Sequence, residues 1–177
     1  GFAEGSRTQN EKGLYSGVKV NWSRAVTTNA YIDVFKFPWM KFQVDGPSLG
    51  HEYMIQQSYR PSRDFEIYVR FREQSKQKNS RYSDGTITEL EDILQRNYRI
   101  NLSYKVSESI KLKSRLEYVT INRNSQEDQD GIILTQDVIF KPKSFPLSLS
   151  MRYALFDTDS YDTRIYTYEN NALYVFS

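Results

Sequence analysis

The sequence contains no cysteine and only one histidine, His51, and both scarcities limit the chemistry open to it. Without cysteine there is no disulfide framework and no thiolate metal site. A hydrolytic triad needs a histidine beside a nucleophile and an orienting partner. Only Ser48 lies near His51, and a loop histidine beside glycine is usually just solvated. We therefore predict a protein that is not an enzyme and that carries no cofactor.

The sequence also lacks any run of about 18 apolar residues, which excludes a transmembrane helix. Its formal net charge is only +2, so it carries no electrostatic footprint of nucleic-acid binding. Residues 1–8 do not resemble a signal peptide. We expect either a removed targeting segment or an internal piece of a longer chain, with residues 1–12 as a linker or mobile arm.

Strand-forming residues are plentiful instead: aromatic residues reach 15%, including 14 Tyr and 10 Phe. Period-two hydrophobicity recurs along the chain, as in Phe65–Phe71 and Leu147–Leu155. Short turns are predicted near residues 27–29, 61–63, 106–108 and 142–144, and longer connections at residues 39–51, 74–96, 123–130 and 157–162. A meander with short turns at one end and long loops at the other is typical of transmembrane β-barrels.

These patterns predict an all-β fold over residues 13–177, an antiparallel up-and-down transmembrane β-barrel of about nine or ten strands. The ninth strand begins near Thr163, and a fragment of a longer chain would leave the barrel incomplete. One segment breaks the pattern. Thr88 and Glu91 have the spacing of a capping box, which indicates a short helix within residues 84–96 of the longest loop.

The two faces of the strands are expected to meet different surroundings. Strands of about 10–13 residues suit a tilted bilayer crossing, with the apolar face toward lipid and the polar face toward the lumen. The predicted lumen-facing polar network comprises Arg70, Arg72, Arg99, Lys111, Lys113, Arg115, Arg152, Glu66 and Glu117. The basic members could line an anion path. A structural network with acidic partners, which also include Asp33 and Asp137, is the favoured interpretation.

Other candidate residues lie at the long-loop end. Candidates for partner contacts are the aromatic residues Trp39, Phe42, Tyr82 and Tyr161. Weak candidates for a metal site are Asp157, Asp159 and Asp162, whose D-x-D spacing could present carboxylates to Ca²⁺. No distal glutamate completes an EF-hand loop. We therefore predict no metal site, and expect these aspartates to cap a turn or to pair with Arg152 and Arg164.

The stretch Ser144–Phe176, and above all its segment FDTDSYDTRIYTYEN, resembles the C-terminal barrel region of Bacteroidota outer-membrane proteins that carry an N-terminal helix-hairpin-helix domain. The blocks Phe35–Trp39, Val44–Ser48 and YRPSRDFEIYVRFR are similar to earlier parts of that region. The resemblance implies an outer-membrane barrel without an assigned activity. No helix-hairpin-helix motif occurs here, so DNA contact does not carry over to this segment.

Together these features predict a non-enzymatic component of a bacterial outer membrane. Its role would be a structural or partner subunit of an envelope assembly, or a small pore. Its partners would be outer-membrane lipid and other envelope proteins. The alternative is a soluble β-barrel or sandwich that binds a ligand in an apolar interior.

Overall fold

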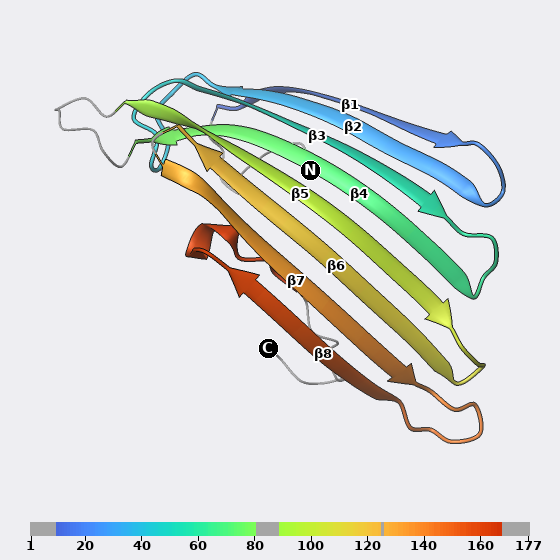
Figure 1. Cartoon of the computed structure of the whole chain (residues 1–177). Coiled ribbons are helices and arrows are strands. Elements are labelled where there is room, and N and C mark those ends of the chain that lie inside the picture. The colour runs from blue at the N-terminus through green and yellow to red at the C-terminus, as the bar shows by residue number, and fades with distance from the viewer. Residues whose placement is uncertain (1–9, 81–88, 125, 168–177) are drawn as a thin grey trace.

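The computed structural model describes residues 10–80, 89–124 and 126–167. These residues form eight strands: β1 (Lys12–Asn21), β2 (Val26–Phe37), β3 (Ser48–Tyr59), β4 (Phe65–Asn79), β5 (Leu90–Lys105), β6 (Ile110–Arg123), β7 (Gln126–Phe140) and β8 (Leu149–Thr158). Each strand pairs antiparallel with its sequence neighbours, so the sheet runs in order from β1 to β8 (Figure 1). The predicted all-β, antiparallel up-and-down architecture is confirmed.

The sheet is open rather than closed. Among the described residues β1 pairs only with β2, and β8 only with β7, so the predicted closure into a barrel is not confirmed. Within the described part of the chain there are eight strands, not nine or ten. After β8 the chain forms the short 3₁₀ helix η1 (Tyr161–Thr163), and residues 164–167 have no regular structure. The rest of the predicted ninth strand, residues 168–177, lies outside the described residues.

Three of the turns between strands are closed by a serine. The hydroxyls of Ser23, Ser62 and Ser107 accept hydrogen bonds from backbone amides two or three residues further on. Backbone bonds also connect adjacent turns, for example from the Arg60 amide to the Ala25 carbonyl. The first turn spans residues 22–25, so its predicted position at 27–29 is wrong. Thr27 and Thr28 belong to β2, because the serine closes the turn before them.

The strands run further toward the long-loop end than predicted. β4 and β5 pair continuously from Phe65 opposite Tyr104 to Asn79 opposite Leu90. The helix predicted within residues 84–96 is therefore wrong for residues 90–96, which belong to β5, and residues 84–88 lie outside the described part. Between β6 and β7 only residues 124 and 125 remain, so the loop predicted at 123–130 is also too long.

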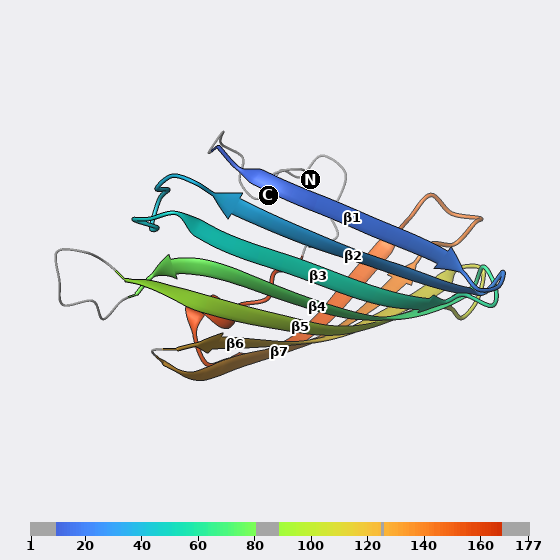
Figure 2. The ribbon, with the colours of Figure 1, turned by 90° about the horizontal axis from the view of Figure 1, so that it is seen from above.

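The sheet follows an arc rather than a plane (Figure 2). Its convex face is turned toward the viewer in Figure 1. On the concave face, near the long-loop end, a small core forms from Phe35, Phe37, Val44, Val119, Ile121 and Ile133. Gly50 is needed there, because a Cβ at this position would lie 2.8 Å from the Ser75 carbonyl oxygen and closer still to the ring of Phe35.

No helix among the described residues is long and apolar enough to cross a membrane.

Candidate functional site

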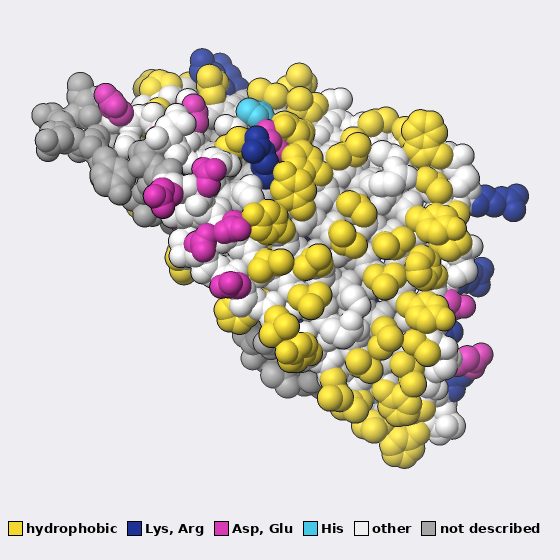
Figure 3. All heavy atoms as spheres, in the orientation of Figure 1, with side chains coloured by type: hydrophobic (Ala, Val, Ile, Leu, Met, Phe, Trp, Pro, Cys, Tyr) yellow, Lys and Arg dark blue, Asp and Glu magenta, His cyan; other side chains and the backbone are white. Residues whose placement is uncertain are grey.

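The convex face carries a continuous apolar zone. Residues paired across antiparallel strands share a face, and one such row runs Val69–Ile100–Leu116–Leu134–Leu155 across five strands. Every member of this row is exposed. The next row toward the short turns contains Ile67, Leu102 and Tyr153, with the polar residues Ser114 and Gln136 between Leu102 and Tyr153. Figure 3 shows the result as a broad field of hydrophobic side chains over the sheet, with acidic side chains gathered toward the long-loop end.

Aromatic rings border this apolar zone on both sides. On the long-loop side, Tyr53, Phe71, Tyr98 and Tyr118 form a chain of ring contacts with centroids 5.1–6.2 Å apart. On the short-turn side, Tyr59, Phe65 and Tyr104 form a second chain, with centroids 6.2–6.4 Å apart. Six residues separate Tyr98 from Tyr104, which corresponds to about 20 Å along β5. The apolar zone thus lies between two aromatic rows.

The charged side chains gather on the opposite, concave face. There the Arg72 guanidinium binds the Glu52 carboxylate in a bidentate fashion, with N–O distances of 2.8 and 2.6 Å. Tyr31 and Gln74 donate to the same carboxylate. Glu52 is buried, yet three donors satisfy it, as a buried charge requires.

A second ion-pair group lies on β5 and β6. Arg99 donates to both oxygens of Glu117, at 2.8 and 3.0 Å, and Arg115 binds the same carboxylate. On β7 and β8, Arg152 binds Asp137 at 2.5 and 2.7 Å. The Arg99–Glu117 and Arg152–Asp137 pairs join neighbouring strands, whereas Arg115 and Glu117 both belong to β6.

In the middle of the sheet, charged side chains are buried and apolar side chains are exposed, the reverse of the usual pattern in a soluble protein. Glu117 and Asp137 are only 3% and 5% exposed, whereas their sequence neighbours Leu116 and Val138 are 39% and 38% exposed. Side chains converge on the concave side of a curved sheet and spread apart on the convex side. The charged face is therefore the more enclosed of the two.

The structure brings the whole predicted polar network to the concave face. The register places Glu66, Lys111 and Lys113 on the same side as the arginines and Glu117. Arg70 donates to Gln56 at 2.8 and 2.6 Å rather than to a carboxylate. Lys113 and Arg115 also line a hollow of about 150 Å³ with Asp137 and Arg152.

The predicted contact residues at the long-loop end have mixed surroundings. Trp39 and Phe42 are 67% and 85% exposed in the connection between β2 and β3. Tyr161, in η1, is exposed as well, and the Arg164 guanidinium lies 3.3 Å from its ring centroid. Tyr82 lies outside the described residues.

His51 is not in a loop, contrary to the sequence prediction. It lies within β3 on the convex face and stacks on Tyr53, with 6.1 Å between ring centroids. Ser48, three residues earlier, points to the opposite face and is buried. The two side chains therefore do not form a nucleophile–base pair.

The three aspartates considered as metal ligands, Asp157, Asp159 and Asp162, have different surroundings. Asp159 accepts a hydrogen bond from the Asp130 amide at 2.9 Å, and this bond lowers the pKa of the Asp159 carboxyl below its ordinary value. Asp162 forms an ion pair with Arg123 at 2.6 Å, a partner that the sequence did not indicate. Asp157 lies on the convex face beside Ile132. Among the described residues no group of three potential ligands is placed to hold a metal ion.

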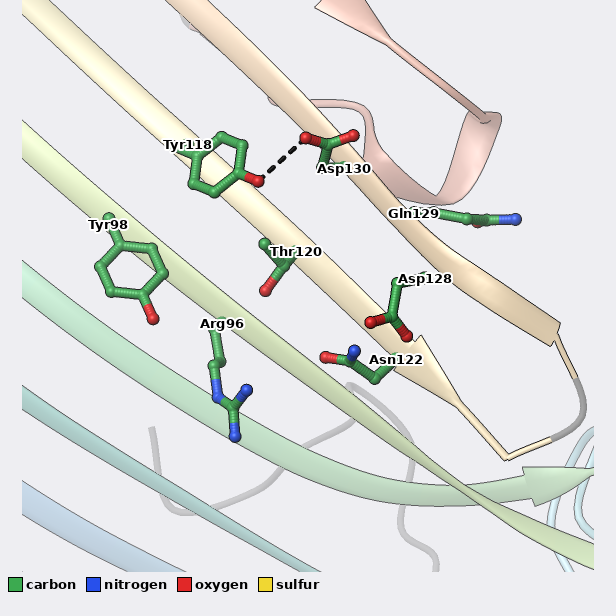
Figure 4. Close-up of a pocket in the computed structure, with 8 residues that line it drawn as sticks. All are labelled: Arg96, Tyr98, Tyr118, Thr120, Asn122, Asp128, Gln129 and Asp130. Atoms are coloured by element: carbon green, nitrogen blue, oxygen red, sulfur yellow. Dashed lines mark hydrogen bonds between the residues drawn. The ribbon is translucent and has the colours of Figure 1, made fainter.

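Sequence reasoning missed a polar cluster that lies next to the aromatic row of the long-loop side, on the side away from the apolar zone. There Tyr53 donates to Glu73 at 2.5 Å and Arg96 binds the same carboxylate at 2.6 Å. Beside it lies an open groove of about 630 Å³ lined by Arg96, Tyr98, Tyr118, Thr120, Asn122, Asp128, Gln129 and Asp130 (Figure 4). Tyr53 and Glu73 are 20 positions apart in the sequence, and Glu73 and Arg96 are 23 apart, so only the strand register brings the three together.

No family model matches the chain, and neither a curated protein nor a solved structure matches it at a significant level.

Proposed function

We propose that this chain is a non-enzymatic outer-membrane protein whose sheet forms the wall of a β-barrel. Within that class, a structural or partner subunit of an envelope assembly is favoured over a small pore. The observation that carries the proposal is the reversal of burial: an exposed apolar convex face and an enclosed charged concave face. The resemblance to Bacteroidota outer-membrane proteins points the same way.

The size of the apolar face supports a hydrophobic surrounding. Soluble monomers rarely expose a contiguous apolar patch larger than a few hundred Å². Here, one exposed apolar row crosses five strands between the two aromatic rows, and a second row there is apolar except for Ser114 and Gln136. Lipid-facing walls of outer-membrane barrels have this arrangement, an apolar band bordered by aromatic girdles. Outer-membrane lipid is thus the first partner that we propose.

The concave face favours a structural role over an open anion path. The arginines at positions 72, 99 and 152 contact carboxylates of neighbouring strands, and Arg115 contacts Glu117 of its own strand. Charges neutralised in this way add little to a field that would draw anions inward. They instead stabilise the wall, because each buried carboxylate has its own cations.

Contacts with other envelope proteins are proposed at the long-loop end. Trp39, Phe42 and Tyr161 are exposed there, and exposed aromatic residues are frequent anchors of interfaces. Loops on a rigid scaffold are common binding sites. Nothing in the charge balance points to nucleic acid as a partner of this segment.

One observation favours the alternative, a soluble β-fold with an apolar interior. The concave face does hold a buried apolar core around Phe35, Phe37 and Val119. This core occupies only the long-loop end, whereas charged pairs fill the middle of the same face. A soluble fold would also have to cover the convex apolar rows with a second layer.

The two proposals differ in their need for detergent. The full chain should sediment with outer membranes, resist extraction by high salt, and be released as a monodisperse β-protein only by detergent. The aqueous control is refolding by dilution without detergent. A monodisperse, detergent-free monomer with native β-signal would overturn the membrane proposal and support the soluble one.

A further inference from the structure

Two lysines lie directly opposite each other at the long-loop end of β1 and β2 (Figure 1). The register pairs Lys12 with Lys36, and both side chains are exposed. They lie on the convex face, because the next pair on their side of the strands is Leu14 opposite Val34, and Val34 is in turn opposite His51. Residues directly opposite each other in an antiparallel pair have Cβ atoms about 4.5–5.5 Å apart. The two ammonium groups can therefore reach the same ligand.

No carboxylate on the same face balances this lysine pair. Among the described residues, the convex positions of β1–β3 include no aspartate and no glutamate. The Asp45 amide donates to the Asn79 side chain at 2.9 Å, which places Asp45 beside β4 rather than β1. Like charges directly opposite each other destabilise a strand pair. An anion bound between the two ammonium groups would therefore stabilise the pairing of β1 with β2.

A second lysine pair shows how the chain balances such a contact elsewhere. Lys105 of β5 lies opposite Lys111 of β6 on the concave face. There the Lys105 ammonium lies 3.6 Å from the Asp64 carboxylate, so this pair has an anion within the chain. The pair of Lys12 and Lys36 has no such anion on its face of β1–β3 among the described residues, which leaves a place for one from a ligand.

The surface next to Lys12 and Lys36 is apolar. On the convex face of β1 and β2, exposed fractions of 46–73% are found for Leu14, Val18, Ile32 and Val34. The lysines lie where this apolar surface ends, and lysines at such a border extend their ammonium groups away from hydrocarbon. In outer-membrane barrels the longer loops face outside the cell. The proposed function therefore places the two ammonium groups at the level of the outer-leaflet head groups.

We propose that Lys12 and Lys36 bind a phosphate group of a phosphorylated glycolipid with several acyl chains, of the lipid A class that forms the outer leaflet of bacterial outer membranes. The inference rests on the proposed function, since it places the convex face in lipid and the long-loop end outside the cell. The phosphate would lie between the two ammonium groups. The acyl chains would lie on the exposed apolar side chains of β1 and β2.

The chemistry of a phosphate monoester matches this lysine pair. Near neutral pH such a group carries a charge of about −1.5 to −2 and three strong acceptor oxygens. Each lysine ammonium has three N–H donors, and its hydrogen bonds to a phosphate are charge-assisted. A head group that also carries an ammonium fits less well, because the described convex positions of β1–β3 hold no carboxylate to receive it.

The charges of the other strands confine the site to β1 and β2. Toward the long-loop end, the convex face of β4–β8 carries the carboxylates of Glu73, Asp92, Asp128, Asp130 and Asp157. Arg96 lies among them and already binds Glu73. A phosphate there would meet net negative charge, whereas beside the β1–β2 lysine pair it meets two cations.

The test compares three lipids retained by the purified full chain in detergent micelles, with native mass spectrometry to count the bound lipids. The lipids are lipid A with its phosphates, the same lipid A with its phosphates removed, and phosphatidylglycerol. We expect phosphorylated lipid A to be retained about tenfold better than the phosphate-free form, because each lysine near anionic lipid contributes several-fold. It should also be retained better than phosphatidylglycerol, which offers a phosphodiester with one negative charge and fewer acyl chains.

The double variant Lys12→Gln/Lys36→Gln should abolish the preference for the phosphorylated form. The matched control is Lys19→Gln/Lys111→Gln, which removes the same charge from exposed lysines of the concave face and should leave the preference unchanged. All four side chains are exposed, so retained β-signal and thermal stability separate lost binding from lost folding.

Three results would overturn this assignment alone: equal retention of the two forms of lipid A, equal retention of phosphatidylglycerol and phosphorylated lipid A, or an unchanged preference in Lys12→Gln/Lys36→Gln. A chain that is monodisperse without detergent would instead overturn the membrane proposal.

Discussion

At the scale of single residues, the most consequential groups are the enclosed carboxylates of the concave face. Glu117 is nearly buried between Arg99 and Arg115, which hold it with several N–H donors. Alternation alone placed these three residues on one polar face. The exact partners were beyond the sequence, because pairing depends on which residues the strand register sets side by side. Arg123, for example, binds Asp162 in η1, far along the chain.

The Glu117→Gln substitution tests this group. It leaves two half-buried arginines without their carboxylate, and breaking a buried ion pair is strongly destabilising. We expect the free energy of unfolding in detergent to fall by about 2–3 kcal/mol, less than for a fully buried pair because both arginines retain some solvent contact.

The matched control for this substitution is Glu108→Gln, in a pair whose side chains are over 70% exposed. Exposed ion pairs contribute about 0–1 kcal/mol, so little change is expected. Guanidinium unfolding followed by far-UV circular dichroism gives both values. Equal changes in the free energy of unfolding for the two substitutions would show that the buried Glu117 carboxylate contributes no more to stability than an exposed one.

At the scale of strands, period-two hydrophobicity predicted the strands best where they carry the apolar rows. It failed toward the long-loop end, at residues 74–79 and 126–130, which are strand but polar on both faces, and at residues 90–96, where apolar and polar side chains occur on both faces. The alternating signal disappears there because neither face is consistently apolar, while the backbone ladder continues the pairing. The Thr88–Glu91 capping box indicated a helix locally, yet β4 and β5 remain paired up to Asn79 and Leu90.

The Leu116→Arg substitution tests the convex face of a strand. Leu116 lies in the apolar row midway between the two aromatic rows. If this face meets lipid, arginine near the bilayer midplane should cost about 2–4 kcal/mol. Lys113→Gln, on the concave face of the same strand, should be nearly neutral. Unfolding in lipid vesicles measures both, and a tolerated Leu116→Arg would place this face in water.

At the scale of the whole molecule, the sequence predicted a barrel that a fragment would leave incomplete, and the described residues form an open sheet. The turn and loop pattern indicated a meander, and the meander is confirmed. Closure depends on what lies along β1 and β8, which period-two patterning does not determine. The sequence did not predict the curvature of the sheet either. This curvature encloses the charged side chains, because they lie on the concave face. The groove beside Arg96 is lined by residues of three strands, β5, β6 and β7, so no local sequence motif could predict it.

The two sheet edges provide the last prediction. Each edge strand presents a row of backbone N–H and C=O groups without a partner strand among the described residues. In the hydrocarbon of a bilayer such groups cost several kcal/mol each, so a membrane wall must have its edges paired. We expect the outward amides of β1 and β8 to exchange hydrogen as slowly in lipid vesicles as those of β5, measured by hydrogen–deuterium exchange. The amide of Glu108, an exposed residue of a short turn, is the fast-exchanging reference. Because the chain has no cysteine, a pair introduced by Val18→Cys and Tyr153→Cys would then report unambiguously whether β1 and β8 pair with each other, by cross-linking within one chain. Fast exchange at both edges in lipid would mean that they stay open, and a transmembrane wall built from this sheet would then be untenable.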